Sequence, residues 1–149
     1  MKEQSIGSSG TPKVVTVLSV SPLEDDHRCL QAIVSHSRWK LLTARDNYEG
    51  FAVLGHYDVS VVLCERNSKP GTWIQFRDYL SNCNHPPSLV VTSGQADEQL
   101  WAQALNLGVW EVLAKPFHRY EVLRSVTAAW YRWHYQFDQP ERCVARAAV

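Results

Sequence analysis

Glu65, Thr92 and Lys115 are the side chains of this sequence best placed to take part in chemistry, because each stands at the end of a short apolar run. The runs are residues 58–64, 89–91 and 109–114. A carboxylate held beside an ammonium forms an ion pair. When such a pair is partly buried, loss of either member destabilises the fold. We therefore expect Glu65 and Lys115 to pair, either as a purely structural contact or as part of a functional site.

The other reactive residue types show no catalytic or ligand-binding pattern. The six histidines are scattered without an HExxH pair, and the four cysteines lack CxxC spacing. Thr92 and Ser93 have no Ser-His-Asp partners in order, and no GxGxxG or GxxxxGK[ST] motif occurs. The sequence therefore argues against a hydrolase triad, a zinc site and a nucleotide-binding loop.

Charge and hydropathy exclude further classes of protein. The 15 Lys and Arg residues balance the 15 Asp and Glu residues, so no basic field points to nucleic acid. No apolar run approaches the roughly 20 residues that a membrane span needs, so we expect no membrane partner. The first residues, 1–5, lack the apolar region of a signal peptide, and we expect a cytoplasmic protein.

The length of 149 residues suits one domain with a sizeable core. Residues 1–12 are rich in Ser and Gly and predict a disordered leader. We expect the folded domain at 13–137 and a loose tail at 138–149, where no core pattern remains.

Strands and helices alternate five times in the predicted secondary structure. Apolar and β-branched runs predict strands at 14–20, 39–44, 58–65, 89–93 and 109–114. Apolar residues at helical spacing predict helices at 25–35, 46–55, 72–80, 96–107 and 119–136. Since parallel neighbours need crossover helices, the sequence predicts an α/β fold with a doubly wound, five-stranded parallel sheet.

Ligands of open α/β sheets bind at the carboxyl ends of the strands. The ends of the first, third, fourth and fifth strands carry Ser21-Pro22, Glu65, Thr92-Ser93 and Lys115-Pro116. We expect these residues to meet in one crevice. Asp25 and Asp26 follow closely, and they either begin the first helix at the positive end of its dipole or fold back to bind a metal ion.

The alternation of elements, Thr92 after the fourth strand and Lys115-Pro116-Phe117 after the fifth together resemble a response-regulator receiver domain of two-component signalling. The resemblance extends over residues 14–135, and Lys-Pro-Phe is its most specific part. It implies a flavodoxin-like sheet with strand order 2-1-3-4-5. It also implies protein partners of a two-component pathway, such as a histidine kinase.

The sequence departs from the receiver pattern at decisive positions. In receivers an acidic pair ends the first strand and helps to hold Mg²⁺, and an aspartate ends the third strand and accepts the phosphoryl group. Here Ser21 and Pro22 replace the acidic pair, and Glu65, one methylene longer, replaces the aspartate. Val112 replaces an aromatic switch residue. Mg²⁺ binds where several oxygen ligands converge, and the acidic pair that would supply them is replaced. We therefore expect no cofactor and no Mg²⁺.

These departures predict an atypical receiver, a pseudo-receiver that is not an enzyme and acts in phosphorelay signalling by protein contact without phosphorylation. Glu65 would then either mimic the phosphorylated state or remain as a carboxylate paired with Lys115. Alternatively, the domain is phosphorylated at this non-standard acidic site. A flavodoxin-like enzyme or cofactor carrier is a third class, which the sequence supports little.

The last predicted helix carries a second candidate functional feature. Leu123, Val126, Trp130, Trp133 and Phe137 follow a 3-4-3-4 spacing that forms one apolar seam. The first half of the seam should pack on the sheet. Trp133 and Phe137 lie beyond the end of a typical receiver, and we expect them, together with Trp130, to form an interface with a second copy or a partner protein.

Overall fold

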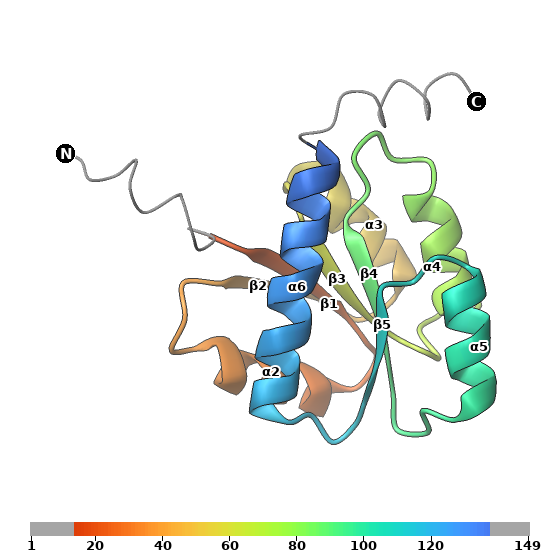
Figure 1. Cartoon of the computed structure of the whole chain (residues 1–149), viewed down its shortest axis with the longest axis horizontal. Helices are drawn as coiled ribbons and strands as arrows, with labels where there is room; N and C mark the ends of the chain where they lie inside the picture. Colours follow the sequence, from red (N-terminus) through yellow and green to blue (C-terminus); the bar gives the residue numbers. More distant parts are fainter. Residues whose placement is uncertain (1–13, 138–149) are drawn as a thin grey trace.

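The computed structural model describes residues 14–137, and a five-stranded parallel sheet forms its centre (Figure 1). The strands are β1 (Thr16–Val20), β2 (Lys40–Ala44), β3 (Val61–Glu65), β4 (Ser88–Ser93) and β5 (Glu111–Ala114). They lie in the order β2-β1-β3-β4-β5, and each neighbouring pair is parallel. The predicted fold class and strand order are confirmed. The expected leader at 1–12 and tail at 138–149 lie outside the described residues.

Helices cover both faces of the sheet. They are α2 (Glu24–Val34), α3 (Asn47–His56), α4 (Trp73–Leu80), α5 (Glu98–Asn106) and α6 (Arg119–Phe137). One hydrophobic core lies between the sheet and α3, α4 and α5, and a second lies between the sheet and α2 and α6. Figure 1 shows α6 in front of the sheet and α3 behind it.

The central strand, β3, is buried along its whole length. Val61 and Leu63 belong to the core beneath α2 and α6, while Val62 and Cys64 belong to the opposite core. A strand with helices on both faces needs apolar side chains on both faces, which explains the nearly uninterrupted run. Since side chains alternate along a strand, Glu65 emerges on the side of α2 and α6.

The register of the sheet brings the candidate residues to one edge. Glu65 lies beside Thr92 across β3 and β4, and Thr92 lies beside Leu113 across β4 and β5. Lys115 follows two residues after Leu113, so its side chain returns to the same face. The backbone N–H of Lys115 donates to the carbonyl of Ser93 at 2.9 Å, which holds the chain at the end of β4.

Helix caps account for most differences between predicted and observed bounds. The side chain of Asp97 accepts a hydrogen bond from the third residue of α5, so this helix begins at Glu98 rather than 96. Asp46 caps α3 in the same way, and Thr72 opens α4 with a capping box. Gly108, with φ of +80°, takes the left-handed conformation that commonly follows a helix end.

Four strands begin later than predicted: β2 at Lys40 rather than 39, β3 at Val61 rather than 58, and β1 and β5 each two residues late. β1 begins at Thr16 rather than 14 because its neighbour β2 begins at Lys40, which pairs with Thr16. β5 begins at Glu111 rather than 109 because the N–H of Val109 bonds back to the carbonyl of Ala104 in α5. Apolar character therefore extends beyond the hydrogen-bonded ladder at both places.

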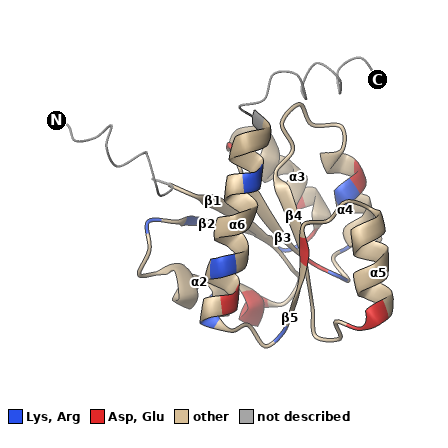
Figure 2. Ribbon diagram, viewed as in Figure 1, with Lys and Arg blue, Asp and Glu red and all other residues tan. Residues whose placement is uncertain are grey.

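In the part of the chain that the structure describes, no helix is long and apolar enough to cross a membrane. Figure 2 shows positive and negative residues interspersed over α6, β5, α4 and α2. The balanced composition is thus also mixed in space on this side of the molecule.

Candidate functional site

The candidate site is a crevice at the carboxyl ends of β3, β4 and β5, with a volume of about 690 Å³. Its lining residues come from the loops that follow these strands and from the start of α2. They are Leu23, Asp26, Glu65, Arg66, Asn67, Ser93, Gly94, Gln95, Asp97 and Lys115. The crevice therefore forms where the topology of an open α/β sheet places a site.

Both carboxylate oxygens of Glu65 are engaged in hydrogen bonds. The residue is only 5% exposed. Its Oε1 accepts from Nζ of Lys115 at 2.5 Å, and its Oε2 accepts from the backbone N–H of Asn67 at 2.8 Å. The expected ion pair between Glu65 and Lys115 is present, and the loop after β3 adds a donor that sequence reasoning did not include.

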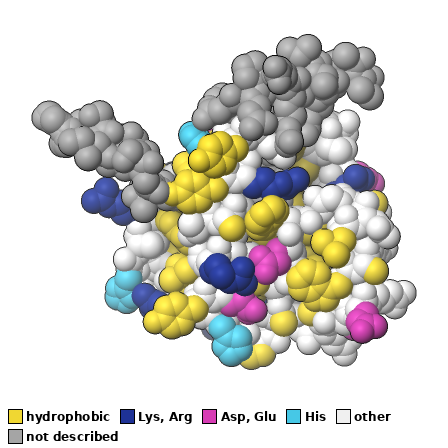
Figure 3. Space-filling view, in the orientation of Figure 1, with side chains coloured by type: hydrophobic (Ala, Val, Ile, Leu, Met, Phe, Trp, Pro, Cys, Tyr) yellow, Lys and Arg dark blue, Asp and Glu magenta, His cyan; other side chains and the backbone are white. Residues whose placement is uncertain are grey.

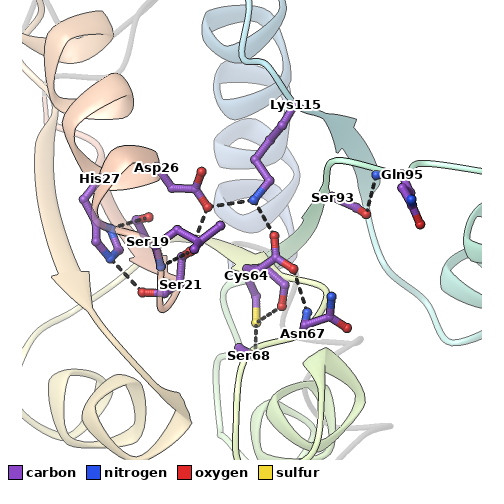
Figure 4. Close-up of polar contacts among 12 residues, drawn as sticks. Ser19, Ser21, Asp26, His27, Cys64, Asn67, Ser68, Ser93, Gln95 and Lys115 are labelled. Carbon is purple, nitrogen blue, oxygen red and sulfur yellow. Dashed lines mark hydrogen bonds and ion pairs between the residues drawn. The ribbon is translucent and has the colours of Figure 1, made fainter.

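Lys115 binds a second carboxylate, that of Asp26 in α2. Its Nζ donates to Oδ2 of Asp26 at 2.8 Å, while the hydroxyl of Ser21 donates to the same oxygen at 2.7 Å (Figure 4). The ammonium thus bridges two carboxylates from α2 and β3. Burial alone would lower the pKa of Lys115, but hydrogen bonds to Asp26 and Glu65 and the charges of both carboxylates outweigh it and raise that pKa.

The hydroxyl groups at the end of β4 play a smaller part than predicted. Thr92 is buried, and its backbone carbonyl accepts from the N–H of Arg66 at 2.8 Å. Within residues 14–137, no hydrogen bond links the Thr92 hydroxyl to Glu65 or Lys115. Ser93 lines the crevice, and its hydroxyl accepts from the N–H of Gln95 at 3.0 Å. The network around Glu65 is therefore built without either hydroxyl.

The two residues in place of the acidic pair have different environments. Ser21 is 2% exposed, and its hydroxyl oxygen accepts from the N–H of Leu23 while donating to Asp26. Pro22 is exposed. Asp25 is also exposed and pairs with Arg28, so it points away from the crevice as a residue of the first helical turn. Of the two aspartates considered for a metal ion, only Asp26 reaches the site.

The donor set suits an ammonium better than a divalent metal ion. Lys115 already occupies the space between the carboxylates of Asp26 and Glu65, and its charge would repel a cation there. Ser21 and Pro22 supply no carboxylate, whereas Mg²⁺ demands several oxygens in octahedral geometry. Among the described residues, no group of three or more His, Cys, Asp or Glu side chains is arranged to hold a metal ion. The residues present do not fit Mg²⁺.

His27 braces the end of β1 and was not singled out by sequence reasoning. It is 5% exposed, with Nε2 2.9 Å from the carbonyl of Ser21 and Nδ1 3.0 Å from the hydroxyl of Ser19. Because a carbonyl oxygen only accepts, Nε2 carries the proton, and in the neutral ring Nδ1 accepts from Ser19.

The sequence also held a signal for Asp26. Asp26, Leu30 and Ile33 follow helical i, i+4, i+7 spacing, and that pattern could have placed Asp26 on the inner face of α2.

A side-chain contact links the end of β3 to the loop that follows it. Cys64 and Ser68 are both buried, with Sγ and Oγ 3.2 Å apart. Burial raises the pKa of the Cys64 thiol to about 12, which keeps it protonated and unreactive at neutral pH. Cys29 and Cys83 are also free thiols, and Cys143 lies outside the described residues. None of the three described cysteines contributes to the crevice.

The remaining receiver-like positions are structural. Val112, at the place of the aromatic switch, is buried in the core beneath α3, α4 and α5. Pro116 follows a cis peptide bond and is exposed just outside the crevice. Lys115 is thus the one residue of the Lys-Pro-Phe motif that lines the crevice among the described residues.

The aromatic residues of α6 are partly built into the domain. The ring of Trp133 stacks on His85, with ring centroids 4.2 Å apart, and its carbonyl accepts from Nε2 of His85 at 3.1 Å. Trp130 packs against the core beneath α2 and α6. Trp133 thus packs against the loop between α4 and β4, which carries His85. Phe137 ends this helix, and its side chain lies outside the description.

The outer surface of α6 still carries apolar groups. Tyr120 is 85% exposed and Tyr135 is 59% exposed. Figure 3 shows hydrophobic side chains in separate groups on this side of the molecule, with charged side chains between them. An interface through Trp130, Trp133 and Phe137 therefore stays a prediction.

No protein-family model matches the sequence, and neither does any curated protein. Solved structures of similar shape are receiver domains. The signal receiver domain of an HD domain-containing protein from Pseudomonas fluorescens Pf-5 has a TM-score of 0.74 at 22% identity, covering 81% of this chain and 98% of that one. A CheY-like receiver domain from Methanospirillum hungatei JF-1 has a TM-score of 0.73 at 13% identity, with coverages of 83% and 98%.

A chemotaxis response regulator of Vibrio cholerae has a TM-score of 0.70 at 15% identity, covering 78% of this chain and 98% of that one. At such low identities the likeness establishes the fold. The chain has the fold of response-regulator receiver domains, with Glu65, Lys115 and Asp26 joined at its carboxyl-end crevice.

Proposed function

We propose that this chain is a receiver-like module of two-component signalling that works by protein contact and without phosphorylation. The observation that carries the proposal is the position of the Lys115 ammonium, which lies within 2.8 Å of both Asp26 and Glu65. A built-in cation takes the place that a metal ion would need, and the site is complete without a ligand.

Phosphoryl transfer at Glu65 would meet two physical obstacles. Transfer depends on positioning and on neutralising the spread negative charge of the phosphoryl group. Glu65 is one methylene longer than aspartate, and a displacement of about 1 Å can cost about a hundredfold in a positioned reaction. In addition, the oxygen of Glu65 that attacks would first have to leave its present donor, which is Lys115 for Oε1 and the Asn67 N–H for Oε2.

The arrangement supports reading Glu65 as a permanent anion in place of a transient one. Its carboxylate holds Lys115 from β5 and the Asn67 N–H from the loop after β3, so it joins two elements that frame the crevice. The Thr92 hydroxyl takes no part in this network. We therefore propose a partial mimic of a charged acceptor, which fixes the crevice but does not recruit the end of β4 through a side chain.

The proposal includes a non-enzymatic role, no resident cofactor or Mg²⁺, and a cytoplasmic location. The free state of the three described cysteines is in keeping with a reducing compartment. Partners would be proteins of a two-component pathway, including a histidine kinase. Contact through α6 with a second copy is a further part of the proposal, for which the exposed Tyr135 and half-buried Trp130 offer apolar surface.

Intact-mass spectrometry after incubation with acetyl phosphate and Mg²⁺ tests this function. We expect the unmodified mass for the chain and for Glu65→Asp, because the shorter acceptor still lacks a metal site. A conventional receiver with an aspartate acceptor serves as the positive control. A phosphoryl adduct mapped to residue 65 would establish the alternative, a phosphorylatable receiver with a non-standard acidic site.

A further inference from the structure

A second cavity, of about 490 Å³, lies between α3 and α4. It is lined by Asn47, Phe51, Pro70, Gly71, Gln75, Asp78, Tyr79 and Asn82. The described residues that line it include none of those lining the Lys115 crevice. Its volume lies within the range of about 300–1,000 Å³ that is typical of small-molecule pockets.

Aromatic rings from both helices form the apolar wall of this groove. Phe51 of α3 and Tyr79 of α4 stack with ring centroids 4.1 Å apart and planes inclined by 17°. Phe51 also stacks on the fully buried Phe76, at 5.2 Å, which fixes its ring from below. Tyr79 remains 38% exposed. A rigid aromatic surface that is open to solvent suits the flat face or edge of another ring.

The amide of Asn47 leaves one acceptor without a donor. Asn47 is completely buried, and its Nδ2 donates to the carbonyls of Pro70 at 3.0 Å and Thr72 at 3.3 Å. Among the residues that the structure describes, none donates to its Oδ1. A buried amide oxygen without a partner is costly, so this wall of the groove favours a donor.

Two further polar residues of the lining are Gln75 and Asp78. Gln75 is already used at the helix start, where its Oε1 accepts from the N–H of Thr72. Asp78 is the one charged residue among the described lining residues, and its carboxylate is 61% exposed beside Arg77. Asp78 therefore gives the groove a negative charge, while Nε2 of Gln75 and the hydroxyl of Tyr79 can still donate hydrogen bonds.

We infer that the groove between α3 and α4 binds a small aromatic amine in its ammonium form. The ring lies against Phe51 and Tyr79, the ammonium lies near Asp78, and N–H groups of the ligand face the acceptors of the lining. An aromatic carboxylate of the same size should bind more weakly, because it would bring a second negative charge beside Asp78.

A titration of the full chain with phenethylamine, followed by amide ¹H–¹⁵N NMR spectra, tests this inference. We expect saturable shifts at Gly71, Tyr79 and Asn82. Phenylacetate, which carries the same ring and the opposite charge, should bind at least about fivefold more weakly. Absent saturation, equal binding of the two probes, or shifts confined to the Lys115 crevice would each overturn the proposal.

Two matched variants separate the groove from general charge attraction. Asp78→Asn keeps the shape and removes the charge, and it should weaken phenethylamine binding by about two- to fivefold. Asp25→Asn removes an exposed aspartate on α2 that also pairs with an arginine, Arg28, and should leave binding unchanged. Tyr79→Ala should weaken both probes by removing the wall. Equal losses from the two aspartate variants would contradict a specific site.

Discussion

The Lys115 crevice and the groove between α3 and α4 use their polar groups in opposite ways. In the crevice, Asp26, Glu65 and Lys115 satisfy one another and are further bound by Ser21 and the Asn67 N–H. In the groove, the described lining leaves an amide oxygen without a donor and a carboxylate facing solvent. A network that is complete within the protein contributes to stability, whereas unmatched acceptors favour a ligand.

The difference predicts where mutations affect folding and where they affect binding. Removing a member of the crevice network leaves its buried partner without a hydrogen bond or an opposite charge, so the free energy of unfolding falls. Removing an exposed acceptor from the groove leaves the fold intact. The four changes below run from the largest expected loss of stability to the smallest.

Lys115→Met should cause the largest loss, because it leaves the carboxylates of Asp26 and Glu65 without their shared cation. Breaking a buried pair costs about 3–5 kcal/mol, and we expect about 3 kcal/mol here because solvent reaches the crevice. For a domain of this size the melting temperature would fall by roughly 10 °C. Urea denaturation measures the change. Glu65→Gln in the same chain should restore part of the loss, and additive effects would contradict direct pairing.

The pH dependence provides a control for this interpretation. The pKa of Lys115 is raised in the folded state, so its contribution is complete below the pKa of an unfolded lysine and is lost as pH rises through the folded value. The stability difference between the natural chain and Lys115→Met should therefore shrink at alkaline pH. The buried Cys64 thiol, with its pKa raised to about 12, lowers stability above pH 9 in both proteins, so its effect cancels.

Asn47→Ala should cost about 2 kcal/mol, because the carbonyls of Pro70 and Thr72 each lose the donor that Asn47 supplies, although Thr72 keeps the N–H of Gln75. This residue sharpens the comparison, since its N–H groups bind within the fold while its oxygen has no donor among the described residues. Chemical denaturation gives the free energy of unfolding. Asn82→Ala is the matched control, because that amide is exposed and should change stability by less than about 0.5 kcal/mol. Similar losses from the two variants would show that the hydrogen bonds of Asn47 make no special contribution to stability.

Ser21→Ala should cost about 1 kcal/mol, since Asp26 loses one of its two donors and the N–H of Leu23 loses its acceptor. The Lys115 contact remains, which limits the loss. A thermal melt measures it. Ser21→Asp would bring a third carboxylate beside Asp26 and Glu65. Mg²⁺ should then stabilise this variant and have no effect on the natural chain, and Mg²⁺ stabilisation of the natural chain would refute the poor fit to the metal.

The sequence predicted the sheet and the carboxyl ends of its strands well, because both depend on local patterns. The buried run through Val61 and Cys64 and the stop at Glu65 follow from strand alternation and from the change to charged residues. Lys115 was predicted at the same edge because parallel strands bring their carboxyl ends together. These inferences need only the order of elements and the period of their side chains.

The partners of Lys115 were harder to predict, because they depend on side-chain rotation and on distant elements. Asp26 lies 89 residues before Lys115, and only its position on the inner face of α2 brings it to the crevice. The contact of Trp133 with His85 was not predicted for a similar reason, since the two residues lie 48 positions apart in the sequence. The groove between α3 and α4 also escaped the sequence, because the stacking of Phe51 on Tyr79 requires the packing of two helices.

Asp78→Asn should change stability least, by less than about 0.5 kcal/mol, because its pair with Arg77 is a surface contact between neighbours. Asp78→Asn should nevertheless weaken phenethylamine binding. Lys115→Met and Ser21→Ala, which change the crevice, should lower stability and leave that binding unchanged. Urea denaturation and the NMR titration on one set of proteins give both quantities. A loss of more than about 1 kcal/mol would show that Asp78 contributes to folding stability. The crevice and the groove would then not differ in the way proposed here.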